Sequence, residues 1–314
     1  MHLTKSSLEG LVVKALSGFF TVETPEGPIV SQIPGRLKKE WLETDIATVG
    51  DWVTISLNED GTGTIEAVAE RRTALARARP SAARRTIDAD REQVLVANVD
   101  QVVCVFSIKN PEPSLRKLDR FLVVAEMNEL PAVICVNKVD LVPLEQAVKQ
   151  FQLYEEIGYQ VIYTSAKTGL GVAELRDLLT GKLSVLSGSS GVGKSSLLNA
   201  VQPGLGLSVR AVSEATGKGM HTTRHAELFP LHGGGYVADT PGIRGLALFD
   251  VEPGELDAYF REIAPLVAFC QFSDCTHRHE PKCAVRTAVA QGKISQQRYQ
   301  SYLRLREEHE KLYQ

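Results

Sequence analysis

The chain has 314 residues, 43% of them apolar, and a formal net charge of −3, which is enough for two or three domains with apolar cores. A charge so close to neutral neither indicates nor excludes a nucleic-acid partner, so any basic surface has to be local. The cysteine count of five is odd and no apolar run approaches the roughly 18 residues of a membrane span, which argues against a disulfide framework and a transmembrane helix. We therefore expect a cytoplasmic protein, with no membrane partner.

Residues 1–72 have the pattern of a small all-β domain. Short β-rich runs are separated at close intervals by Gly18, Gly27, Gly50 and Gly61. The runs read GLVVKAL, FFTVET, PIVSQI, DWVTISL and GTIEAVAE. Regular short strands with turn signals predict a β-barrel, and five strands suit an OB-fold. An SH3-like barrel fits the same pattern nearly as well.

An arginine-rich segment, RRTALARARPSAARR, follows the barrel and makes up much of an Arg-rich linker at residues 73–93. It contains no acidic residue. Its arginines are Arg71, Arg72, Arg77, Arg79, Arg84 and Arg85. Two interpretations stay open, a solvated linker and a segment that contacts nucleic-acid phosphates.

Residues 94–248 change to an α/β texture. VDQVVCVFSI and PAVICV are near-continuous apolar runs, as expected of parallel strands buried on both faces. Between them, SLRKLDRFLVVAEMN has apolar residues at helical spacing, and LEQAVKQFQLYEEIG, GVAELRDLL and SSLLNAV predict further helices. This alternation predicts a doubly wound sheet. Residues 249–314 are mostly helical and end in a polar helix for which we expect few core positions.

A phosphate-binding loop follows the predicted strand LSVLS and opens a helix. Its pattern is G-x-x-x-x-G-K-S, and its residues are Gly188, Ser189, Ser190, Gly191, Val192, Gly193, Lys194, Ser195 and Ser196. Glycines let successive backbone N–H groups turn inward around phosphate oxygens. We expect Lys194 to reach the β- and γ-phosphates as part of the catalytic machinery, and the Ser195 hydroxyl to bind Mg²⁺.

Two further motifs choose the base. NKVD, with Asn137, Lys138 and Asp140, follows the strand AVICV. A fixed carboxylate at Asp140 accepts hydrogen bonds from two guanine donors that adenine lacks, so adenine leaves it unpaired. The Lys138 stem can pack on the purine face. A second segment, Ser165, Ala166 and Lys167, follows the strand QVIYT and supplies a backbone N–H for the guanine oxygen.

The γ-phosphate side is predicted from two segments after the phosphate loop. In DTPG, Asp239 binds a Mg²⁺ ligand water and the Gly242 N–H senses the γ-phosphate. The loop GKGMHTTR supplies a threonine for Mg²⁺, which we expect to be Thr223 with Thr222 as the alternative. Ile243 stands where small GTPases carry a water-orienting glutamine, so the free protein should hydrolyse slowly. His221 is the nearest candidate for that task, and an ordinary loop histidine is the other interpretation.

A metal site is predicted in FCQFSDCTHRHEPKCAV. Its four ligands, which fall within fourteen residues, are Cys270, Cys275, His277 and Cys283. Three thiolates and one imidazole suit a closed tetrahedral Zn²⁺ site, and the stretch has few apolar residues to fold without a metal. His279 is an alternative to His277. Cys104 and Cys135 lie in apolar strands and are expected to be core thiols.

The motifs run in the order NKVD, SAK, phosphate loop, threonine loop and DTPG, whereas ordinary GTPases begin with the phosphate loop. Joining the usual ends and reopening the chain after DTPG gives the order seen here, a circular permutation. DTPG then leads directly into the Cys/His segment, so that an order–disorder switch in nucleotide state could move that segment.

With these motifs the chain resembles the RsgA (YjeQ) family of GTPases over essentially all its residues. The segments that carry the resemblance are SLRKLDRFLVVAE, NKVDL, TSAKTG, GSSGVGKSSLLN, GKGMHTTRH, DTPGIR and CQFSDCTHRHEPKCAV. The resemblance implies an OB-fold, a circularly permuted P-loop GTPase domain, and a Cys–Cys–His–Cys zinc domain. It also implies GTP hydrolysis stimulated by the small ribosomal subunit during late maturation, with GTP or GDP, rRNA, Zn²⁺ and Mg²⁺ bound. The threonine loop is less arginine-rich here than is usual in the family.

The leading function is therefore a GTPase that matures or checks the small ribosomal subunit, expected to be a monomer. One competing function is a passive RNA- and GDP-binding module with negligible turnover, which Ile243 favours. Another is a GTPase that acts on a protein or a membrane. The lack of a basic amphipathic helix or a lipidation signal argues against the membrane role.

Overall fold

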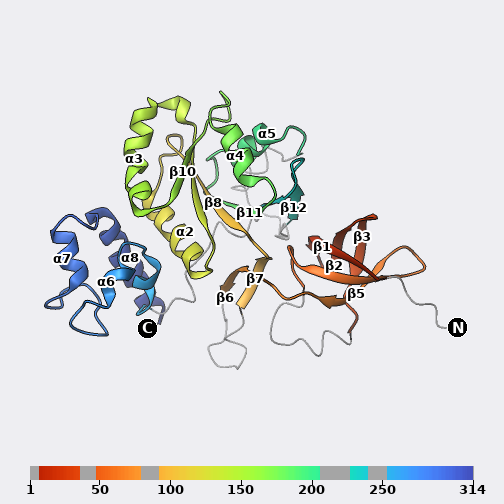
Figure 1. Cartoon of the computed structure of the whole chain (residues 1–314), viewed down its shortest axis with the longest axis horizontal. Coiled ribbons are helices and arrows are strands. Elements are labelled where there is room, and N and C mark those ends of the chain that lie inside the picture. The colour runs from red at the N-terminus through yellow and green to blue at the C-terminus, as the bar shows by residue number, and fades with distance from the viewer. Residues whose placement is uncertain (1–6, 36–46, 79–91, 206–226, 240–252, 314) are drawn as a thin grey trace, which may run out of the picture.

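The computed structural model describes residues 7–35, 47–78, 92–205, 227–239 and 253–313 (Figure 1). Three parts follow one another along the chain, a β-barrel, an α/β layer structure and a helical C-terminal module. Among the helices so described, none combines the length and the apolar character that crossing a bilayer requires.

The N-terminal part is a five-stranded barrel. Its strands are β1 (Ser7–Leu16), β2 (Phe19–Thr24), β3 (Gly27–Gln32), β4 (Trp52–Leu57) and β5 (Gly63–Val68). Antiparallel pairing joins β1 to β2, β2 to β3, β4 to β5 and β1 to β4, and β3 runs parallel to β5, so the sheet closes on itself. Alternate residues point inward and form a small core that includes Val12, Val22, Ile55 and Ile65. This closure is the OB arrangement that the five runs predicted.

A two-stranded hairpin, β6 (Ala74–Ala78) and β7 (Glu92–Ala97), follows the barrel. The first two arginines of the arginine-rich segment form ion pairs within the protein. Arg71 donates from Nε and Nη2 to the two carboxylate oxygens of the fully buried Asp51, each at 2.8 Å. Arg72 lies 3.5 Å from Asp100 at the surface. Of the remaining arginines, Arg79, Arg84 and Arg85 lie outside the described residues.

The α/β part is built on a sheet of order β10-β9-β8-β11-β13-β12. Its strands are β8 (Gln101–Ser107), β9 (Ala132–Asn137), β10 (Gln160–Tyr163), β11 (Leu183–Ser187), β12 (Glu227–Pro230) and β13 (Tyr236–Asp239). All pairs are parallel except β12 with β13. Every residue of β8, β9 and β11 is buried, as their continuous apolar runs predicted.

Helices cover both faces of this sheet (Figure 1). They are α2 (Leu115–Met127), α3 (Leu144–Ile157), α4 (Val172–Leu179) and α5 (Lys194–Val201), and a 3₁₀ turn, η2, spans Val139–Leu141. Val102 and Phe106 of β8 pack with α2 and α3, whereas Val103 and Val105 between them pack with α4 and α5. The period of two along the strand therefore divides the apolar residues between the two layers.

Cys104 and Cys135 are core thiols, as predicted. Cys104 of β8 and Cys135 of β9 are both fully buried. Burial raises the pKa of each thiol to about 12, so both remain protonated at neutral pH.

The C-terminal module packs on α2. It contains η4 (Leu256–Tyr259), α6 (Ala264–Val267), α7 (Ala284–Ala290) and α8 (Gln296–Tyr313). Helix α2 contacts both η4 and α8. Phe260, Tyr302 and Leu305 belong to the same continuous apolar cluster as Leu118 of α2, so this module shares a core with the α/β part.

Helix α8 is more buried than its polar sequence predicted. Arg298 is fully buried and donates to Asp119 of α2 and to Glu262, at 2.6 Å in each case. Its guanidinium lies 4.6 Å from the centre of the Phe260 ring. Asp119 also accepts from the hydroxyl of Tyr154 on α3, at 2.8 Å. Polar residues can thus fill core positions because they satisfy one another.

Candidate functional site

The carboxyl ends of three parallel strands bring the predicted nucleotide motifs together. The phosphate loop follows β11, NKVD begins at the last residue of β9, and SAK comes two residues after β10. The register pairs Tyr163 with Val136, so β9 and β10 end within one residue of each other, whereas the last residue of β11 lies level with Ile134 of β9 through β8. This edge is where ligands bind in open α/β sheets.

Glycines are required in the phosphate loop by close packing. Gly193 has φ +96°, and a Cβ there would lie 2.4 Å from Nδ2 of Asn137. That Nδ2 donates to the carbonyl oxygen of Val192 at 2.9 Å, so the first residue of NKVD holds the phosphate loop in place. Gly188 is equally constrained, because a Cβ would lie 2.2 Å from the carbonyl oxygen of Val105. The two motifs are therefore one interlocked unit.

Lys194 opens helix α5 and folds over its own loop. Its ammonium group donates to the carbonyl oxygens of Gly188 and Ser189, at 2.7 and 3.1 Å. The group thus lies over the concave side of the loop, where phosphate oxygens bind in loops of this type.

The base-reading half is held by hydrogen bonds between NKVD and the segment after β10. The hydroxyl of Ser165 donates to Oδ1 of Asp140 at 2.6 Å, which fixes the orientation of that carboxylate. Thr164 and the backbone N–H of Ala166 both approach Oδ1 of Asn137, at 3.4 Å. A carboxylate fixed in this way can accept two parallel N–H groups from one ligand.

Lys138 connects three loops. It has a left-handed backbone, with φ +63°, and its ammonium group donates to the carbonyl oxygens of Gly191, at 2.7 Å, and of Asn110. Asn110 lies in the loop between β8 and α2. The aliphatic stem of Lys138 therefore spans the space between NKVD and the phosphate loop, where a flat ring can lie against it.

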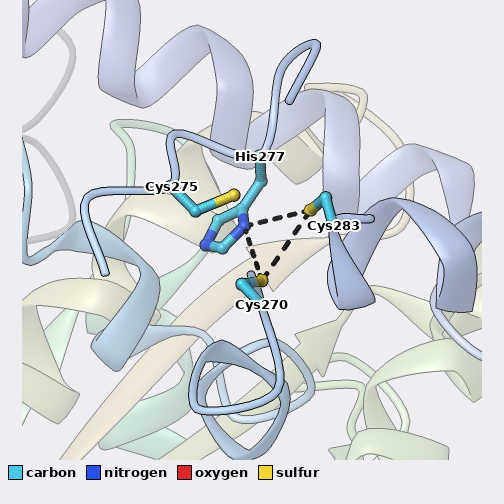
Figure 2. Close-up of side chains that lie close together, drawn as sticks. All are labelled: Cys270, Cys275, His277 and Cys283. Carbon is cyan, nitrogen blue, oxygen red and sulfur yellow. Dashed lines mark hydrogen bonds between the residues drawn. The ribbon is translucent and has the colours of Figure 1, made fainter. Parts of the chain in front are cut away.

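The four predicted metal ligands come together in the C-terminal module (Figure 2). Nδ1 of His277 lies 3.6 Å from Sγ of Cys270 and 3.3 Å from Sγ of Cys283, and the two sulfurs are 3.9 Å apart. All four ligand atoms, that of Cys275 included, lie within 4.8 Å of one another. Ligands about 2.0–2.3 Å from a tetrahedral ion are roughly 3.3–3.8 Å apart. Three of the four ligand atoms are close to this spacing and that of Cys275 is within about 1 Å of it, which suits one zinc ion.

His277, and not the alternative His279, belongs to this cluster. The His277 side chain is fully buried, whereas His279 is exposed and uses its backbone N–H to bond to Glu280 at 3.0 Å.

Family comparisons agree with this architecture. The profile of the RsgA GTPase family matches residues 68–249, and that of the RsgA N-terminal domain matches residues 9–65. The chain belongs to the RsgA GTPase family.

Curated relatives match over nearly the whole chain. A protein named small ribosomal subunit biogenesis GTPase RsgA from Gemmatimonas aurantiaca is 45% identical, over 96% of this chain and 98% of the relative. Its namesake from Thermotoga maritima is 42% identical, over 94% and 95%.

Two solved structures are similar as well. The crystal structure of YjeQ from Thermotoga maritima has a TM-score of 0.78 at 38% identity, covering 97% of this chain and 99% of that one. YloQ, described as a circularly permuted GTPase, has a TM-score of 0.75 at 34% identity, covering 99% and 98%. The fold predicted from the motif order is thereby confirmed.

The structure describes some of the predicted site residues and not others. The structure describes those of NKVD, SAK, the phosphate loop and the Cys/His cluster, and the backbone of Asp239 at the end of β13. His221, Thr222, Thr223, Gly242 and Ile243 lie outside the described residues. Their roles, and the limits of the three domains, stay predictions.

Several residues of the two sites were not predicted from the sequence. Thr164 immediately precedes SAK, and Asn110 follows a buried strand, positions where site residues of an α/β fold are expected. Asp257 contacts the ring of His277, and Glu280 accepts backbone N–H groups of the residues beside His277. Glu280 lies among the ligands in the sequence and could have been noticed, whereas Asp257 is thirteen residues before Cys270 and no pattern marks it.

Proposed function

We propose that this protein hydrolyses GTP and acts in the biogenesis of the small ribosomal subunit. The observation that carries the first half is the pair Ser165–Asp140, held beside the phosphate loop by Asn137. The second half is supported by membership of the RsgA GTPase family and by relatives named for small-subunit biogenesis. Because ribosomal subunits are the proposed partner, we expect the protein to act in the cytoplasm and as a monomer.

Guanine is selected at Asp140. Its two carboxylate oxygens accept the N1–H and the exocyclic amine of guanine, Ser165 keeps the carboxylate in the plane of the base, and the N–H of Ala166 donates to the guanine oxygen. The stem of Lys138 packs on the ring, and Lys167 is part of the same base-binding segment. Adenine provides neither donor and would leave a fixed charge unpaired.

The phosphates bind along the loop from Gly188 to Ser196. Its backbone N–H groups surround the phosphate oxygens, and Lys194 exchanges the carbonyl oxygens it now contacts for the β- and γ-phosphates. Ser195 and Thr223 would hold Mg²⁺, with Asp239 acting through a water, and the bound ion would supply positive charge to offset the charge that develops on the phosphates. Gly242 senses the γ-phosphate, and His221 positions the attacking water in the complex with the subunit.

The Cys/His cluster holds one structural Zn²⁺ per chain. The support is its ligand chemistry and spacing, because three thiolates and one imidazole leave no open position for substrate. We propose that the barrel, the arginine-rich segment and the zinc module together contact rRNA. Such binding should weaken steeply as salt rises, because phosphate contacts release counterions.

Base selection is tested with Asp140→Asn. The variant should bind GTP roughly 10- to 150-fold more weakly, the equivalent of about 1.5–3 kcal/mol, and should prefer xanthine nucleotides, which carry an oxygen where guanine has its amine. Asp177→Asn, an exposed position on α4, is the matched control and should bind GTP as the unmodified protein does. If Asp140→Asn binds GTP as tightly as the unmodified protein does, the assignment of Asp140 is wrong.

A further inference from the structure

A carboxylate contacts the histidine of the metal cluster from the side away from the sulfurs. Nε2 of His277 lies 3.0 Å from Oδ2 of Asp257. Both residues are buried, His277 fully and Asp257 with 6% exposed. Asp257 comes from η4, which precedes the four ligands in the sequence.

The contact determines which nitrogen can bind a metal. A neutral imidazole carries one N–H and one lone pair, and a carboxylate accepts the N–H. With the proton on Nε2 beside Asp257, the lone pair of Nδ1 is directed at Cys270 and Cys283, which lie 3.6 and 3.3 Å away. The contact with Asp257 therefore favours the tautomer that a metal ion needs, and it holds the ring in the matching orientation.

The backbone of His277 is held independently of Asp257. The residue has φ +60°, and its carbonyl oxygen accepts from the hydroxyl of Tyr299 at 2.5 Å. Glu280 accepts the backbone N–H groups of Thr276, Arg278 and His279, at 2.8, 2.9 and 3.0 Å.

This carboxylate of Glu280 stays charged. Burial alone would raise the pKa of Glu280, but the hydrogen bonds from Thr276 and the neighbouring N–H groups outweigh it and lower the pKa to about 2. These bonds fix the backbone of the loop. The His277 ring can still rotate and change tautomer, and its hydrogen bond to Asp257 restricts both changes.

We propose that Asp257 is a positioning residue of the zinc site, which presents Nδ1 of His277 to the ion and sets the affinity for it. The inference rests on the proposal that the cluster binds zinc. Removing such outer carboxylates costs about 10- to 100-fold in metal affinity in other sites. Under this proposal η4 both packs on α2 and orients a ligand of the zinc site.

The test compares three variants of the full chain. Asp257→Ala removes the acceptor, Asp257→Asn keeps a side-chain oxygen that can accept from Nε2, and Glu255→Ala removes an exposed carboxylate next to the same turn. Zinc affinity is measured at neutral pH by competition with a chromophoric chelator. The thermal midpoint is measured for the zinc-free and the zinc-loaded form of each protein.

We expect the zinc dissociation constant to rise about 10- to 100-fold in Asp257→Ala, less in Asp257→Asn and not at all in Glu255→Ala. The rise in thermal midpoint on adding zinc should shrink in the same order. A purely structural role would instead lower the midpoints of both forms equally. That result, or an unchanged zinc affinity in Asp257→Ala, overturns the inference, whereas absence of zinc binding by the unmodified protein overturns the zinc site itself.

Discussion

The barrel and the zinc module flank the same α/β part but are attached to it by different kinds of contact. The zinc module is attached by side chains, through a shared apolar core and through Arg298, which is shared between Asp119 and Glu262. The barrel contributes Leu11 and Val49 to the same apolar core, but each described hydrogen bond that joins it to β7 and Asn98 has a backbone group on at least one side. Ala97 of β7 donates to the carbonyl oxygen of Val49 at 2.9 Å.

A buried side chain and a single strand bridge add to the barrel attachment. Asn98 donates from Nδ2 to the carbonyl oxygen of Gly50 at 2.9 Å. One residue pair, Lys14 with Glu227, joins β1 to β12. A side-chain attachment depends on residue identity, whereas a backbone attachment depends on how closely two segments approach.

The largest effect is expected from loss of the metal. Cys283→Ser removes one zinc ligand and should unfold the segment around Cys270, because structural zinc supplies about 10–16 kcal/mol in small zinc modules. The described nucleotide-binding residues lie on other elements, so GTP affinity should be largely retained. Metal analysis and GTP titration of the same preparation check both points. An absence of zinc in the unmodified protein, purified without chelator, would contradict this account.

Arg298→Ala should have the next largest effect. It leaves the carboxylates of the buried Asp119 and the partly buried Glu262 without their shared partner, and loss of one partner of a buried pair costs about 3–5 kcal/mol in comparable cases. Denaturant unfolding of the zinc-loaded protein measures this loss. The control is Arg304→Ala, an exposed arginine on the same helix, for which we expect a change within about 0.5 kcal/mol. Similar losses in the two variants would mean that the buried cluster does not hold the module.

At the barrel, Gly50→Ala tests the close approach of two backbones. Gly50 has φ +92°, and a Cβ would lie 2.1 Å from the carbonyl oxygen of Ala97. Gly18 has a similar φ of +84° but open space around it, so Gly18→Ala carries the backbone cost alone, about 1 kcal/mol. Gly50→Ala should therefore lose more stability than Gly18→Ala in the same unfolding assay. Equal losses would show that the contact with β7 is dispensable.

The smallest effect is expected at the strand bridge. Lys14 and Glu227 form an ion pair of 2.9 Å with side chains about 41% and 40% exposed, and pairs of this kind contribute at most about 1 kcal/mol. A double-mutant cycle with Lys14→Ala and Glu227→Ala isolates the pair. A coupling well above 1 kcal/mol would mean that this bridge, and not the contact with β7, fixes the barrel.

The sequence predicted the features that depend on local patterns and missed those that depend on contacts between distant segments. The barrel strands, the α/β layers and the metal ligands were predicted because turn glycines, buried apolar runs and ligand spacing are local patterns. Arg298 was not, because a charged residue in a polar helix is usually exposed and its partners come from distant elements. Gly50 was expected at a turn, but its approach to Ala97 depends on how the barrel docks. Asp257 carries no local signal at all.

Single-turnover GTP hydrolysis, measured with and without saturating small ribosomal subunits, tests the central claim of a subunit-dependent GTPase most directly. Because Ile243 cannot orient water, we expect the free protein to turn over far below the usual ~1–100 s⁻¹ of phosphoryl-transfer enzymes, and subunits to accelerate it by orders of magnitude. His221→Ala should bind GTP and subunits but lose most of that acceleration. If subunits leave the rate of the unmodified protein unchanged, the protein is a guanine-nucleotide-binding module and not a subunit-dependent enzyme.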